Sequence, residues 1–125
     1  MLLRVLLGAF FVAHGLVHLL YFVPSGDPKY PMTAEKSWLV TRIGLPLGVV
    51  SPVVSALAAA SAVGFCLLAL SYWGLVVPTA WLPALAVISV TTSLLLVAVT
   101  WNIQFIFSVF INIAILYWAL VWRTR

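Results

Sequence analysis

The sequence predicts an all-α fold, an integral membrane up-down-up-down bundle of four helices with one longer loop between the first and second helix. Hydrophobic residues make up 66% of the 125 positions and charged residues only 6%. A soluble domain carries about a quarter charged residues, whereas a membrane-spanning helix needs about 20 apolar residues. The chain has room for four such segments, so we expect a single transmembrane domain over residues 1–125.

The apolar runs place the four helices at about 2–23, 50–72, 79–99 and 101–122. The first run follows Arg4 as in a signal peptide, but it is too long for a signal core and lacks a small-residue cleavage site. We therefore expect a retained helix. The connection near Thr100 is so short that the third and fourth helices should be antiparallel neighbours.

The predicted loop at 24–48 is the one substantial hydrophilic region. It holds both acidic residues, Asp27 and Glu35, and four of the seven prolines. Thr33 is a suitable N-cap for a short helix over 34–43, with Glu35 in the first turn where it favours the helix dipole. Trp38 and Arg42 would suit this helix to lie at the membrane interface.

The formal net charge is +4, yet the basic residues do not cluster as they would for nucleic acid. They divide equally between the two ends of the bundle: Arg4, Arg123 and Arg125 with the termini, Lys29, Lys36 and Arg42 in the loop. Such residues usually anchor helices at lipid headgroups, and arginines beside helix ends favour the cytoplasmic side. We therefore expect a bacterial inner-membrane protein with cytoplasmic termini, in contact with the bilayer and not with nucleic acid.

Two histidines, His14 and His18, lie four residues apart in the first apolar segment and so share one helix face. Polar groups in membrane helices generally face the bundle interior and often mark functional sites. The helical rise places both histidines in the half of the membrane that faces the loop. Depth counting along the other helices predicts that the same polar pocket is lined by Ser55, Thr91, Thr92, Asn102 and Asn112.

Imidazoles at this spacing can bind one metal ion together, and a single imidazole can ligate haem iron. The zinc-protease version has a glutamate between the histidines, and here the intervening residues are Gly15, Leu16 and Val17. The alternative is that both histidines only donate hydrogen bonds to neighbouring helices, worth about 0.6 kcal/mol each. Phosphate loops, nucleophile elbows and clustered carboxylates are absent, so the sequence leans against an enzyme.

The first helix contains the run Arg-Val-Leu-Leu-Gly at 4–8, followed by Ala-His-Gly-Leu at 13–16. This resembles the opening helix of DoxX-like proteins, small bacterial four-helix membrane proteins, some of which are associated with quinone-linked sulfur oxidation. The resemblance covers about one helix and the overall layout, and it does not extend to His18 or the loop. It implies a component of a quinone-linked redox system.

Three functional hypotheses follow. The first is a non-catalytic membrane subunit or scaffold, in a homo-oligomer or a larger complex, whose histidine pocket binds a metal, haem or another ligand. The second is the DoxX-like redox component. The third is a small proton-coupled transporter, because small multidrug-resistance transporters have a similar length, although His14 would have to replace the acidic residue of their first helix.

Overall fold

The computed structural model describes residues 1–122, and the regular structure in that range is entirely helical. The predicted all-α class is therefore confirmed. Four helical stretches are long and apolar enough to cross a membrane: Leu2–Phe22, Leu47–Trp73, Thr79–Val99 and Ile103–Val121. Their bounds lie close to those expected from the apolar runs in the sequence.

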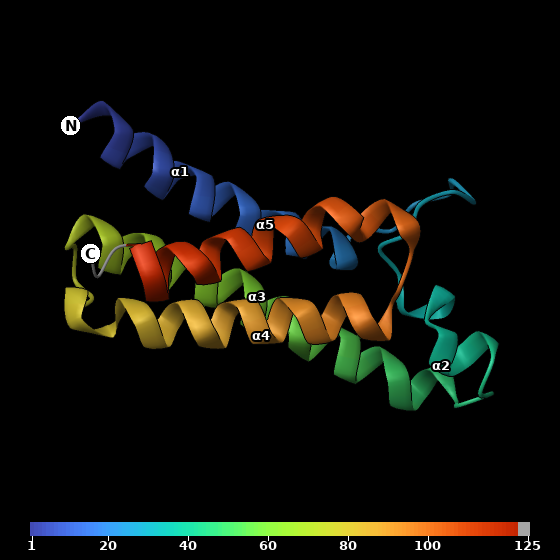
Figure 1. Cartoon of the computed structure of the whole chain (residues 1–125). Helices are drawn as coiled ribbons and strands as arrows, with labels where there is room; N and C mark the ends of the chain where they lie inside the picture. Colours follow the sequence, from blue (N-terminus) through green and yellow to red (C-terminus); the bar gives the residue numbers. More distant parts are fainter. Residues whose placement is uncertain (123–125) are drawn as a thin grey trace.

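Several of these stretches consist of an α-helix joined to a short turn of another helical type. The first is α1 (Leu2–Val17) continued by η1 (His18–Phe22), and the second is α3 (Leu47–Trp73). The third is η3 (Thr79–Trp81) followed by α4 (Leu82–Val99). The fourth comprises η4 (Ile103–Phe105), α5 (Ile106–Tyr117) and η5 (Trp118–Trp122). In Figure 1 the chain start and the α3–α4 turn lie at one end, and the α4–α5 turn and the long loop lie at the other.

The second long helix begins three residues before the predicted start and ends one residue later. Pro46 is its N-cap, so the helix begins as soon as the proline is passed. Gly74 ends it in the left-handed conformation, with φ of 73°, which a glycine adopts at no steric cost. The amide of Gly74 closes this end by donating to the Leu70 and Ser71 carbonyls.

The long loop contains two short helices, η2 (Ala34–Lys36) and α2 (Trp38–Thr41), where one helix over 34–43 was predicted. Ser37 separates them because its backbone is extended and its hydroxyl caps α2 by accepting from the Leu39 amide. The same hydroxyl donates to the Val99 carbonyl at 2.6 Å. The loop is therefore tied to the last turn of α4.

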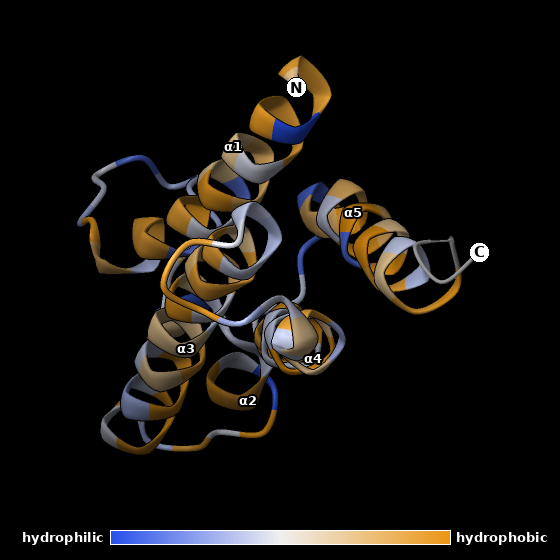
Figure 2. Cartoon of the chain, turned by 90° about the vertical axis from the view of Figure 1, so that its left-hand side faces the viewer, coloured by the Kyte–Doolittle hydropathy of each residue, from blue (hydrophilic) through white to orange (hydrophobic). Residues whose placement is uncertain are grey.

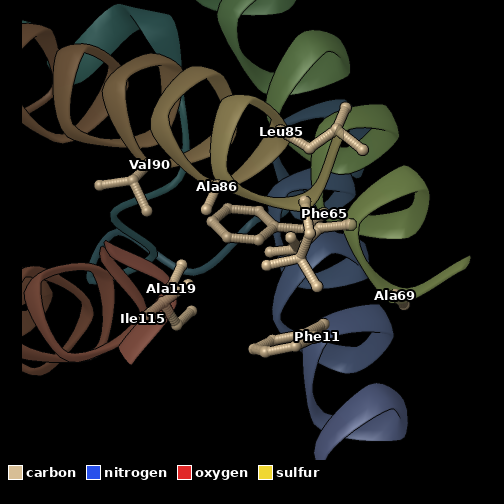
Figure 3. Packing of buried hydrophobic residues seen from close by; sticks show 10 residues of the cluster. Phe11, Phe65, Ala69, Leu85, Ala86, Val90, Ile115 and Ala119 are labelled. Carbon is tan, nitrogen blue, oxygen red and sulfur yellow. The ribbon is translucent and has the colours of Figure 1, made fainter. Parts of the chain in front are cut away.

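The main packing runs through α3, which lies between α1 and α4. Phe65 is fully buried at the centre of the apolar cluster in Figure 3. Close approach depends on glycine: a Cβ on Gly15 would lie 2.9 Å from the Phe65 Cβ, and one on Gly64 would lie 2.5 Å from the Ser89 hydroxyl. Figure 2 shows α5 beside α4, and it shows apolar residues along the length of the long helices.

Candidate functional site

Both histidines of the first helix are buried, with His14 9% and His18 5% exposed. Their rings are perpendicular, with centroids 5.4 Å apart. Phe65 of α3 lies against both rings, at 4.7 Å from His14 and 5.7 Å from His18. The i, i+4 spacing thus turns both imidazoles toward the packed centre of the bundle.

Both ring nitrogens of His18 are engaged. Nδ1 donates to the carbonyl of His14 at 2.9 Å and lies 3.2 Å from that of Gly15. Carbonyls only accept, so Nδ1 carries the hydrogen, and Nε2 of the neutral ring is an acceptor. The Ser93 hydroxyl donates to this Nε2 at 2.8 Å. The hydrogen-bond network therefore assigns the tautomer of His18.

Asn112 extends the network from α4 to α5. Its Nδ2 donates to the Ser93 hydroxyl at 3.0 Å and to the Ser108 carbonyl at 2.9 Å. Ser93 and Asn112 are both fully buried. The chain of hydrogen bonds from His18 through Ser93 to Asn112, called here the polar network, joins three of the long helical stretches.

His14 lies beside this network, and its side chain has an unpaired atom. Its buried Nε2 has no hydrogen-bond partner, and neither has the buried Oδ1 of Asn112. The two side chains lie close enough to favour a hydrogen bond with each other, although neither of these two atoms has a partner at good hydrogen-bond geometry. Both atoms are buried, where a hydrogen bond that is not well made costs free energy.

A cavity of about 130 Å³ lies next to the network, in the half of the bundle that faces the loop. Its volume corresponds to roughly four water molecules at their share of liquid volume. Met32 of the long loop contributes to its wall, so the cavity lies beneath the loop. The lining residues with polar side chains are His14, His18, Tyr21, Gln104 and Ser108.

The other predicted pocket residues lie elsewhere. Thr92 donates to the Ser89 carbonyl, and Thr91 on the same helix is exposed. Asn102 caps η4 by accepting from the Gln104 amide. Ser55 is half-buried in α3 and does not line the cavity. Depth counting placed these residues by height alone, whereas the rotation of each helix decides which side chain faces the histidines.

Sequence reasoning missed Ser93 and Ser108. A signal for them exists, because Ser89 and Ser93 lie four residues apart on α4, and Ser108 and Asn112 lie four apart on α5. Polar residues that repeat at helical spacing in an otherwise apolar helix predict one buried polar stripe. Two such stripes, set beside the His14 and His18 pair, would have pointed to the polar network.

The site is a poor fit for a metal ion or a macrocycle. Within residues 1–122, no group of three or more histidine, cysteine, aspartate or glutamate side chains is placed to hold a metal. His18 has no nitrogen to offer unless it breaks its bond to Ser93. A cavity of about 130 Å³ is also small beside the roughly 300–1,000 Å³ of pockets for drug-sized ligands.

The fold and the site together define an all-helical protein with four candidate membrane spans and a buried polar network beside a small cavity. Comparison with known proteins adds no relative, because no family model, no curated protein and no solved structure matches the chain.

Proposed function

We propose that this chain is a non-catalytic subunit of the bacterial inner membrane that binds a small, neutral, hydrogen-bonding ligand beside His14. In this proposal the four apolar helices cross the bilayer in an up-down-up-down arrangement. The observation that carries the proposal is the unpaired Nε2 of His14, a buried polar atom on a residue that lines a small cavity with both polar and apolar side chains in its wall.

Membrane insertion is supported by the large apolar side chains on the outside of the helices. Phe107 is 75% and Phe110 64% exposed, a state that costs free energy in water and none in lipid. Arg4 donates to the carbonyls of Tyr72 and Trp73, at the end of the bundle that carries the amino terminus. An arginine fixed beside helix ends suits the cytoplasmic face, which is where we place the termini.

The chemistry of the ligand follows from the groups that would meet it. On the cavity wall, His14 offers one unpaired ring nitrogen, Ser108 a hydroxyl and Gln104 an amide. A molecule with one donor and one acceptor would satisfy the first two. A charged ligand would need an opposite charge, and the cavity wall carries no acid, lysine or arginine.

A catalytic role has no support in this arrangement. The cavity wall offers no carboxylate as a general base, because both acids lie in the loop. Asp27 is occupied there, since its Oδ1 accepts from the Lys29 amide at 2.9 Å. A binding or scaffold role within an oligomer or a larger membrane complex remains the simplest use of the site.

Acetamide is a suitable probe because it is small and carries both an acceptor and donors. We expect saturation-transfer NMR on the detergent-purified chain to detect acetamide bound to the wild type. The signal should be lost in His14→Leu and kept in Ser89→Ala, a buried change away from the cavity wall. Equal binding by wild type and His14→Leu would overturn the proposal.

A cofactor in place of the neutral ligand, and each of the other two hypotheses, would give a different result in companion measurements on the same sample. A haem absorption band or stoichiometric metal lost in His14→Ala and His18→Ala would replace the neutral ligand with a cofactor. Perturbation by a quinone analogue would favour the DoxX-like redox component. Uptake into liposomes that depends on pH and vanishes in His14→Ala would favour the proton-coupled transporter.

A further inference from the structure

Besides the cavity near the histidines, a surface groove lies at the loop end of the molecule, on the outside of the bundle. It has a volume of about 450 Å³ and lies between the short helix α2 and the end of α4. We call it the Arg42 groove. Its lining residues are Lys36, Trp38, Thr41, Arg42, Ala98 and Trp101.

Two basic residues and no acidic residue line the Arg42 groove. Within residues 1–122, the Arg42 side chain has neither a hydrogen bond nor an ion pair. The ammonium of Lys36 donates to the carbonyls of Pro28 and Tyr30, which leaves one of its three N–H groups free. Pro28 and Tyr30 line a different hollow, together with Glu35 and Lys36 itself, so the Lys36 ammonium is engaged on that side. Arg42 therefore presents an unpaired fork of donors, which suits a phosphate.

The position of the groove matches the boundary between hydrocarbon and headgroups. It opens where the third candidate membrane span ends at Val99. Trp38 and Trp101 form its walls and are 37% and 48% exposed, as expected for indole rings at a membrane interface. The Arg42 guanidinium would therefore meet the headgroup layer, while the indole rings would meet the start of the acyl chains.

The end of α4 would repel an anion if its last carbonyls were bare. The loop covers them instead, since Trp38 Nε1 donates to the Ala98 carbonyl and the Ser37 hydroxyl to that of Val99, both at 2.6 Å. These bonds satisfy two carbonyls of the last turn. Two of the carbonyls that an anion would meet are therefore already bonded, and the positive charge of Arg42 decides which ligands the groove prefers.

We propose that the Arg42 groove binds the phosphate headgroup of an anionic phospholipid and so fixes the long loop to the membrane surface. The proposal goes beyond the ligand proposed for His14 and shares with it only the insertion of the bundle. Loss of lipid binding would therefore not change the acetamide result, and loss of acetamide binding would not change the lipid titration.

The test is a titration of the full chain in non-ionic detergent with brominated short-chain phosphatidylglycerol, read from quenching of tryptophan fluorescence. Each basic residue near a lipid surface contributes about 1 kcal/mol, so Arg42→Gln should weaken binding about fivefold. Lys29→Gln is the matched control, because it removes the same charge from an exposed loop position outside the groove. It should change the affinity by less than about twofold.

Arg42 is exposed and its side chain bonds to nothing within the described chain, so Arg42→Gln should leave the fold intact. Equal losses in the two variants would show general attraction between charges and overturn the site. Equal quenching by brominated phosphatidylcholine would overturn the requirement for an anion. Inorganic phosphate that competes as well as the lipid would reassign the groove to a free phosphate.

Discussion

The change Ser93→Ala tests whether the polar network holds the bundle together. The Ser93 hydroxyl accepts from Asn112 at 3.0 Å and donates to His18 at 2.8 Å, so one substitution removes both links between helices. A hydrogen bond inside a membrane bundle averages about 0.6 kcal/mol and reaches about 1.7 kcal/mol. Two such bonds predict a loss of about 1–3 kcal/mol in the free energy of unfolding.

The matched control for this change is Ser89→Ala, one turn earlier on the same helix. Both serines are fully buried, but the Ser89 hydroxyl has no hydrogen-bond partner. Its removal should leave stability unchanged or raise it slightly, because an unpaired buried hydroxyl is a cost. Unfolding in mixed micelles with increasing SDS, followed by circular dichroism, measures both. An equal effect of the two substitutions would refute the assigned role of Ser93.

Two further predictions concern the packing and the loop. Gly15→Ala should lower the free energy of unfolding by about 1–3 kcal/mol, because its methyl group would lie 2.9 Å from the Phe65 Cβ. The control Gly48→Ala has open space around it and should be neutral or stabilising. Equal losses in the same SDS titration would contradict this packing. Trp38→Phe should speed amide hydrogen exchange in the long loop by removing its indole bond to α4. Trp101→Phe should not, and equal exchange in the two variants would show that the bond does not hold the loop.

Composition and the spacing of apolar residues were enough to predict the four long helices. Apolar runs of this length have few alternatives, because a chain with 6% charged residues cannot cover so much apolar surface in water. The short helices of the loop were predicted less well. A single helix was expected there, and Ser37 divides it because its hydroxyl is bound both to α2 and to the end of α4, a contact distant in sequence.

The candidate site was predicted in part. His14 and His18 share a face by helical geometry alone, and Asn112 does join His18 through Ser93. The prediction selected Thr91 and Thr92 on α4 at about the right depth, but the helix turns Ser93 inward. An error of one or two positions along a helix changes the direction of a side chain by 100° or 200°, at about 100° for each residue.

The all-α class, the number of long helices and the histidine pair could all be predicted from the sequence, because they follow from local hydropathy and helical period. The contacts of the two histidines could not be predicted, because they depend on the folded bundle. That outcome depends on how each helix is rotated about its own axis, and the rotation is set by close contacts such as Gly15 with Phe65 and Gly64 with Ser89. The same contacts leave the Nε2 of His14, a residue that lines the cavity, without a partner, while the Ser93 hydroxyl donates a hydrogen bond to the Nε2 of His18.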